Sequence, residues 1–179
     1  MKLVSRFARA VIALVVMTLH LVGPAGAAGA AQPAPHPTAK PTVVLVHGAF
    51  AESASWDAVA RQLRARNFPV IAAANPLRGL KSDAAYVGAI VDSVPGPVVL
   101  VGHSYGGAVI SAAADAKPNV KALVFVSAFA PAAGESALDL STKFPGSTLG
   151  QALAAPVVLP AGTKDLYIRQ DKFPDQFAA

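Results

Sequence analysis

Residues 98–114 read VVLVGHSYGGAVISAAA, and this stretch decides the fold. An apolar, β-branched run is followed by a serine between two glycines and then by small apolar residues, an order that predicts a strand, a tight turn and a helix. Ser104 therefore stands in the pattern G-x-S-x-G, in the strand-to-helix context that this motif requires. A side chain at Gly102 or Gly106 would collide with neighbouring backbone in such a turn. The pattern predicts that Ser104 is a nucleophile; the alternative is a glycine-rich turn with an incidental serine.

The same alternation of patterns continues on both sides of this stretch. Short β-branched runs predict strands, and longer runs with apolar residues at three- and four-residue spacing predict helices. The expected strands are 42–46, 68–74, 98–101 and 120–130, and the expected helices are 52–67, 82–94 and 105–116. The order βαβαβαβ predicts an α/β fold with a mostly parallel sheet and helices on both faces. In such a fold, functional groups gather at the carboxyl ends of the strands.

Polar residues mark where two of these helices are expected to begin. Ser53 or Ser55 is the expected N-cap of the first helix, and Ser82 or Asp83 that of the second.

After the last expected strand, the alternation of strand and helix patterns weakens. Two short helical stretches, a short VVL strand and scattered Gly and Pro predict that residues 131–179 form a cap or lid segment rather than more sheet.

The N-terminus has the layout of a secretory signal peptide. A start with Lys and Arg precedes an apolar run, and small residues then lead to a cleavage site after Ala27, with Ala30 as the second choice. An uncleaved anchor is the alternative, but the apolar run is shorter than the about 20 residues that a membrane span needs. We expect a signal peptide at residues 1–27, a secreted or periplasmic protein, and no stable membrane span after cleavage.

The rest of the chain has the composition of one globular domain. Residues 28–41 are rich in Pro and Ala and predict an extended linker, which leaves 42–179 as the domain. Cysteine is absent, so the domain relies on a buried core and not on disulfides. The formal charge of +5 includes Lys2, Arg6 and Arg9 of the signal region, so the mature chain carries about +2. This charge gives no indication of a nucleic-acid partner.

A second motif, LVHGAF at residues 45–50, begins in the last two residues of the first expected strand and continues into the loop after it. Acyl transfer places negative charge on the carbonyl oxygen, and fixed N–H donors aimed at that charge supply much of the rate. The expected donors are the backbone N–H of Ala49 in this loop and that of Tyr105, which follows the nucleophile. The positive end of the helix that begins at Tyr105 adds to their effect.

Together these motifs resemble the α/β-hydrolase superfamily. The resemblance is carried by VVLVHGAF, Trp56, VVLVGHSYGG and VKALVFVSAFAPAAGES, and it covers roughly residues 42–140. Within the superfamily the chain is similar to the branch of plant methyl esterases and hydroxynitrile lyases and their bacterial esterase-like relatives. The resemblance implies that Ser104 is the nucleophile, that Ala49 and Tyr105 are the oxyanion donors, and that Phe50 forms a wall of the substrate pocket.

Other residues near the motifs have structural interpretations. The histidine of an HG pair is expected to pack under its loop, which assigns His47 a structural role. The side chain of His103, which precedes the nucleophile, is expected to point away from Ser104. Trp56 is expected to pack in the core near the start of a helix.

The sequence lacks a histidine after the nucleophile. A serine hydroxyl needs a general base, and in this fold the chain order is serine, acid, histidine. No histidine follows His103, although Glu135 or Asp139 offers an early acid. We expect a C-terminally truncated hydrolase that lacks its acid and histidine and is itself inactive; a complete, non-catalytic relative is the alternative.

The expected function is that of a secreted serine hydrolase that cleaves a small-molecule carboxylic ester through an acyl-enzyme on Ser104. No metal cluster, phosphate-binding loop or dinucleotide motif is visible, so no cofactor or metal is expected. Two alternatives remain: a catalytically inactive binding protein, and a lyase or cofactor-free peroxidase, because one fold hosts many reactions.

Overall fold

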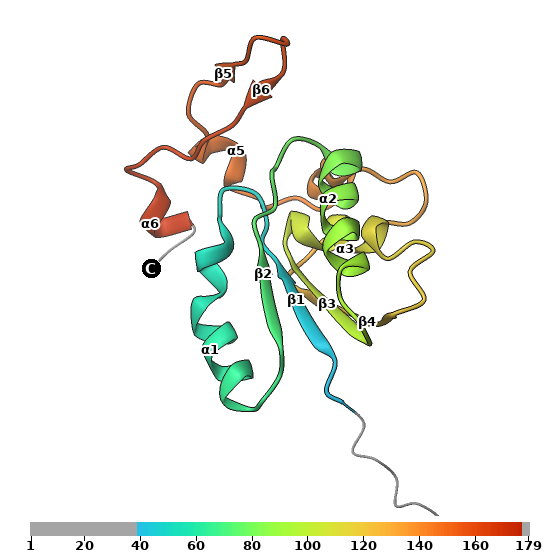
Figure 1. The fold of residues 1–179 in the computed structure, drawn as a ribbon. Coiled ribbons are helices and arrows are strands. Elements are labelled where there is room, and N and C mark those ends of the chain that lie inside the picture. The colour runs from blue at the N-terminus through green and yellow to red at the C-terminus, as the bar shows by residue number, and fades with distance from the viewer. Residues whose placement is uncertain (1–38, 177–179) are drawn as a thin grey trace, which may run out of the picture. The chain divides into compact units, whose positions relative to one another are not determined.

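A computed structural model describes residues 39–176 of the chain. The expected signal peptide at 1–27 and most of the expected linker at 28–41 lie outside these residues. Figure 1 shows the elements in chain order. They are β1 (Thr42–Val46), η1 (Ser53–Trp56), α1 (Asp57–Ala65), β2 (Val70–Ala73), α2 (Leu80–Asp92), β3 (Val98–His103), α3 (Tyr105–Ala113), β4 (Val120–Val126), α4 (Ala137–Thr142), α5 (Leu149–Ala152), β5 (Val157–Val158), β6 (Lys164–Asp165) and α6 (Phe173–Gln176).

The first four strands form a parallel sheet in the order β2-β1-β3-β4, which confirms the expected α/β fold. Helix α1 covers one face of the sheet, and α2 and α3 cover the other (Figure 1). In the register of β1 with β3, Val46 pairs with Gly102. The loops that follow these two strands therefore emerge side by side.

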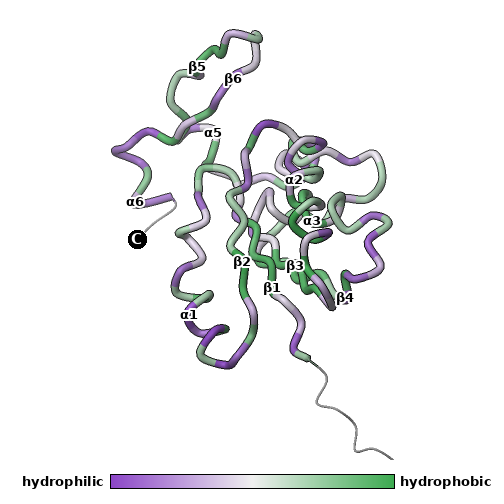
Figure 2. The backbone as a smooth tube through the Cα atoms, viewed as in Figure 1, coloured by the Kyte–Doolittle hydropathy of each residue, from purple (hydrophilic) through white to green (hydrophobic). Residues whose placement is uncertain are grey.

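The core lies on both faces of the central strands. Alternate residues of β1 serve the two faces: Val44 and Val46 join the cluster under α2 and α3, whereas Val43 and Leu45 pack with Trp56 against α1. Burial on both faces explains why β1 is apolar at every position after Thr42. In Figure 2 the central strands are hydrophobic along their length, and α1 carries hydrophilic residues.

The glycines of the serine turn are as crowded as the sequence predicts. A Cβ at Gly102 would lie 2.5 Å from the carbonyl oxygen of Gly106, and a Cβ at Gly106 would overlap the carbonyl oxygen of Val46. A Cβ at Gly107 would lie 2.7 Å from the side chain of Ala128. Glycine at these positions allows α3 to pack directly on the strands.

The expected helix caps are wrong. The hydroxyl of Ser55 donates to the carbonyl oxygen of Glu52 at 2.6 Å, and that of Ser82 donates to the carbonyl oxygen of Gly79 at 2.9 Å. Neither hydroxyl caps its helix, and both helical segments have N-caps without a side-chain cap bond. Helix α2 begins earlier than expected, so Asp83 falls inside its first turn.

Two expected strands are shorter than their patterns. Strand β2 begins at Val70 rather than at residue 68, and β4 ends at Val126 rather than at residue 130. Strand β4 lies at one edge of the sheet, and Val124 and Phe125 are exposed there. An edge strand lacks a neighbouring strand on one side, so its side chains are more exposed than the apolar sequence of β4 predicts.

The chain after Pro131 contains only short elements within the described residues. Strands β5 and β6 pair with each other in an antiparallel ribbon and do not join the four-stranded sheet. Between residues 39 and 176, no helix combines the length and apolar character that crossing a membrane requires. The assignment of residues 131–179 as a cap stays a prediction.

Candidate active site

Ser104 occupies a strained turn between β3 and α3. Its backbone has φ 53° and ψ −123°, in the left-handed half of φ space that residues with a Cβ rarely adopt. The Ser104 carbonyl oxygen accepts hydrogen bonds from the N–H groups of Gly107 and Phe129, both at 3.0 Å. Such strain costs about 1–3 kcal/mol and persists only where the surroundings hold it. The turn is thus held both by its own helix and by the loop after β4.

Similar strain recurs beyond the carboxyl end of every strand in the sheet. Phe50 (φ 62°) follows β1, Leu77 (φ 56°) follows β2, Ser104 follows β3, and Ser127 (φ 42°) follows β4. All four are non-glycine residues with positive φ, a conformation that clusters at functional sites. Asn67 and Ala116, in the turns before β2 and β4, also have positive φ, so this conformation alone does not select an edge. The carboxyl edge is the candidate active site because it carries Ser104, as the fold class predicts.

The loop after β1 lies directly against the serine turn. A Cβ at Gly48 would lie 2.7 Å from the Cβ of Ser104 and 2.9 Å from the carbonyl oxygen of His103. Only glycine permits this approach. The structure thus brings the Gly48–Phe50 loop beside Ser104, and Tyr105 begins α3, where the first N–H groups lack intrahelical partners.

His47 is buried beneath this loop. Its Nδ1 lies 2.9 Å from the carbonyl oxygen of Gly48, and its own carbonyl oxygen accepts a hydrogen bond from Asn75 Nδ2 at 3.2 Å. Both side chains are buried. His47 and Asn75 therefore hold the loop in place, in agreement with the structural role expected for His47.

His103 packs against Trp56. The two rings meet edge to face, with centroids 6.4 Å apart and planes at 85°. Trp56 is buried in the core cluster beside α1, as the sequence predicts. This ring contact directs the His103 side chain to the α1 face of the sheet, whereas Tyr105 packs against the cluster on the other face.

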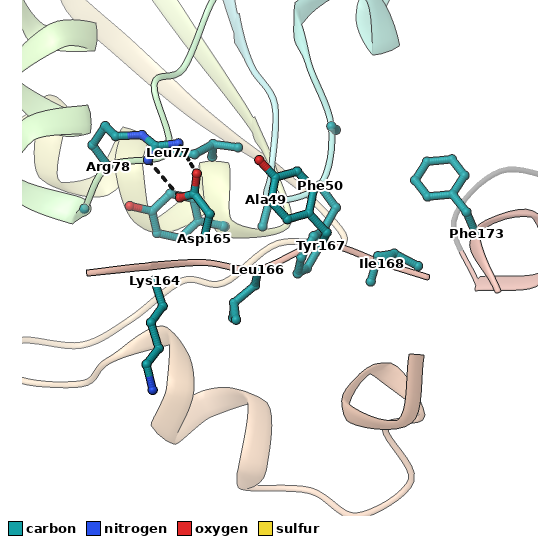
Figure 3. Close-up of a pocket in the computed structure, with 13 residues that line it drawn as sticks. Ala49, Phe50, Leu77, Arg78, Lys164, Asp165, Leu166, Tyr167, Ile168 and Phe173 are labelled. Atoms are coloured by element: carbon teal, nitrogen blue, oxygen red, sulfur yellow. Dashed lines mark hydrogen bonds and ion pairs between the residues drawn. The ribbon is translucent and has the colours of Figure 1, made fainter. Parts of the chain in front are cut away.

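Two cavities open beside the serine turn. The larger, of about 680 Å³, is drawn in Figure 3. Its walls come from the loops after β1 and β2, from the start of α3 and from the C-terminal part of the chain: Ala49, Phe50, Ala51, Leu77, Arg78, Gly79, Tyr105, Lys164, Asp165, Leu166, Tyr167, Ile168 and Phe173. The second, of about 530 Å³, shares Phe50 and is also lined by His103. Ser104 lines neither cavity, but both of its chain neighbours do.

Three charged residues of this region were not singled out as site residues from the sequence. The fully buried carboxylate of Asp83 accepts a hydrogen bond from the Tyr105 hydroxyl at 2.9 Å. Burial and this hydrogen bond raise the pKa of the Tyr105 phenol. Arg78 forms an ion pair with Asp165 at the cavity wall. Arg78 lies in the loop after β2, at the carboxyl edge of the sheet, so its position could have identified it from the sequence as a candidate site residue. No local sequence pattern identifies Asp165 as a site residue.

The two candidate early acids make local contacts. Glu135 accepts from the N–H of Ala132 and pairs with Lys143, and these interactions lower the pKa of its carboxyl. Asp139 forms a capping box with Ser136 at the start of α4, which lowers the pKa of its carboxyl.

Between residues 39 and 176, no group of three or more His, Asp or Glu residues is placed to hold a metal ion.

Comparison with known proteins supports this architecture. The model of the alpha/beta hydrolase family matches residues 43–179. A carbendazim-hydrolysing esterase of Nocardioides sp. is 49% identical over 47 residues, which are 26% of this chain and 19% of that protein.

Solved structures show the same fold. A crystal structure of the pyrethroid hydrolase PytH superposes with a TM-score of 0.62 at 26% identity, over 77% of this chain and 61% of that one. Polyneuridine aldehyde esterase superposes with a TM-score of 0.64 at 19% identity, over 75% and 60%. The chain thus spans less than two thirds of the length of each of these relatives. Because the family model covers most of the chain and the parallel sheet carries the serine turn at its carboxyl edge, the chain belongs to the alpha/beta hydrolase family.

Proposed function

We propose that this protein hydrolyses small-molecule carboxylic esters through an acyl-enzyme formed on Ser104. The observation that carries the proposal is the contact of the strained serine turn with the Gly48 loop, because it sets a hydroxyl beside two candidate backbone donors. The names of the relatives, a carbendazim-hydrolysing esterase and a pyrethroid hydrolase, support hydrolysis as the reaction class.

The proposed chemistry has two steps. In the first, Ser104 Oγ adds to the ester carbonyl carbon while a base removes its proton, and the carbonyl oxygen becomes an oxyanion held by the N–H groups of Ala49 and Tyr105. The bond to the alcohol oxygen then breaks, and the alcohol leaves with that proton. In the second step water attacks the acyl-enzyme in the same way and frees Ser104. Phe50, which lines both cavities, is the proposed wall beside the bound acyl or alcohol group.

The base is the missing component. No histidine follows Ser104 in this sequence, and both histidines of the fold are engaged elsewhere, His47 beneath its loop and His103 against Trp56. We propose that the catalytic acid and histidine are absent from these 179 residues. A small soluble base is therefore needed to reveal the reactivity of Ser104.

A serine-directed fluorophosphonate tests this function. In the presence of imidazole the probe is expected to label the folded chain once, with the adduct mapped to Ser104 by peptide mass spectrometry. Ser104→Ala should stay unlabelled, whereas the matched control Ser141→Ala, at a half-buried serine of α4, should label as the parent does. Equal labelling of Ser104→Ala and the parent would reject the proposal. A folded but unlabelled parent would instead favour a non-catalytic binding protein.

We also propose that the protein is exported. The proposal is supported by the positive start, apolar run and small residues of positions 1–27. N-terminal sequencing of the protein from a secreting host is expected to begin at Ala28. A chain that retains Met1 in the exported fraction would contradict this prediction.

A further inference from the structure

The larger cavity is bounded on one side by a segment that is distant in sequence from the serine turn. One wall consists of the loops after β1 and β2 and of Tyr105; the opposite wall is formed by residues 164–168, here named the outer segment, together with Phe173. A volume of about 680 Å³ suits a drug-sized group. The position of the outer segment therefore determines how large a group the cavity accepts.

The outer segment is attached to its neighbours in sequence by backbone hydrogen bonds. Asp165 and Lys164 pair with β5, and Ile168 forms an isolated bridge with Leu153. The carbonyl oxygen of Tyr167 accepts a hydrogen bond from the N–H of Ala154 at 2.8 Å. These bonds order the outer segment internally, but they do not link it to the four-stranded sheet.

A two-pronged ion pair links the outer segment to the loop after β2. Arg78 Nη1 donates to Asp165 Oδ1 at 2.8 Å, and Nη2 donates to Oδ2 at 3.2 Å (Figure 3). Arg78 Nε also donates to the carbonyl oxygen of Pro76 at 3.1 Å, which fixes the plane of the guanidinium. The hydrogen bond to Asp165 raises the pKa of Arg78. Paired N–H···O bonds of this kind fix orientation as well as distance.

Arg78 is itself tied to the serine turn. The buried carboxylate of Asp83 accepts from the backbone N–H of Arg78 at 3.0 Å and from that of Gly79 at 3.4 Å. The same carboxylate accepts from the hydroxyl of Tyr105, the residue after Ser104. A continuous chain of hydrogen bonds therefore runs from Tyr105 through Asp83 and Arg78 to Asp165.

Two of the three charged residues that line this cavity cancel each other's charge. Arg78 and Asp165 neutralise each other, and the Lys164 side chain extends away from the pair in Figure 3. Most other lining residues are apolar, among them Leu77, Leu166 and Ile168. A group with its own charge would lose hydration in this cavity without gaining an unpaired partner at the pair.

We propose that Arg78 and Asp165 are specificity-determining residues of the proposed ester site: their ion pair fixes the outer segment as a cavity wall and selects esters with a large, uncharged apolar group. The selection among esters rests on the proposed function, because it concerns the ester-hydrolysis reaction. The binding of a large apolar group in the cavity does not depend on that reaction. The two are therefore testable separately.

Binding of the neutral apolar dye Prodan to the whole chain provides the first test. Arg78→Gln and Asp165→Asn are expected to weaken dye binding about fivefold, the upper range for one exposed ion pair. The exchanged pair Arg78→Asp with Asp165→Arg should restore most of the affinity. Asp92→Asn, which removes the ion pair of Asp92 with Lys117 away from the cavity, is the matched control and should bind as the parent does.

Hydrogen exchange locates the effect. In the single variants the amides of residues 164–168 should exchange faster than in the parent, and Prodan should slow them in the parent. Unchanged dye affinity and unchanged exchange in both single variants would overturn the proposal, as would an equal loss of affinity in Asp92→Asn. Thermal midpoints close to that of the parent exclude unfolding as the cause.

A kinetic comparison links the cavity to the reaction. With imidazole as base, KM for 4-methylumbelliferyl heptanoate relative to KM for the acetate should rise in both single variants, and an unchanged ratio would overturn the selection of large esters. If Ser104 proves unreactive while dye binding depends on the pair, the proposed function fails and the binding inference stands. If Ser104 reacts but the pair affects neither binding nor the KM ratio, the inference alone fails.

Discussion

Ester hydrolysis by the 179-residue chain is expected to stay near background in plain buffer, to rise with added imidazole, and to lose that rise completely in Ser104→Ala. The reason is that the serine turn and the Gly48 loop are present, whereas no histidine follows Ser104 to accept its proton. A general base typically contributes 10²–10⁴-fold, so the loss in Ser104→Ala should be about 100-fold at saturating imidazole. The measurement is release of 4-methylumbelliferone from its acetate, with imidazole alone as the blank.

The controls separate the nucleophile from its base. Ser141→Ala should keep the imidazole-dependent rate, because Ser141 lies on α4 and its hydroxyl donates to the carbonyl oxygen of Leu138 in the same helix at 2.8 Å. An imidazole-dependent rate that survives in Ser104→Ala would exclude Ser104 as the nucleophile. Fast hydrolysis without imidazole that Ser104→Ala abolishes would show that another group of this chain serves as base.

Gly106→Ala is expected to produce a large loss of stability at the serine turn. The added Cβ would overlap the carbonyl oxygen of Val46 and lie 3.0 Å from that of His47. Both oxygens belong to backbone at the end of β1, so neither can move without displacing the loop or the strand. Overpacking of this kind costs about 3 kcal/mol, a large part of the about 5–15 kcal/mol that stabilises a domain.

Urea unfolding followed by circular dichroism measures this loss. The matched control is Gly150→Ala in α5, where an added Cβ meets nothing within 4 Å and alanine favours the helix. Gly150→Ala should be neutral or slightly stabilising. A Gly106→Ala variant that unfolds at the same urea concentration as the parent would contradict the close contact of α3 with β1.

Local patterns were sufficient for the sheet and the serine turn. Runs such as 42–46 and 98–101 are apolar at nearly every position because both faces of a central parallel strand are buried, and this signature needs no tertiary knowledge. The glycines around Ser104 were also predictable, because the turn itself demands them. The ends of elements were not: Ser55 and Ser82 match an N-cap by type, but their hydroxyls donate to backbone carbonyls instead.

The sequence by itself therefore determined the parallel sheet, the position of Ser104 at its carboxyl edge, and the loop that lies beside it. Tertiary structure alone decided which polar groups meet: Asn75 with His47, Asp83 with Tyr105, and Arg78 with Asp165. The physical reason is the separation along the sequence between the residues that interact. Burial of strands and helices repeats with a period that a short window of sequence reveals, whereas Arg78 and Asp165 are 87 residues apart and meet only after the outer segment has folded onto the cavity.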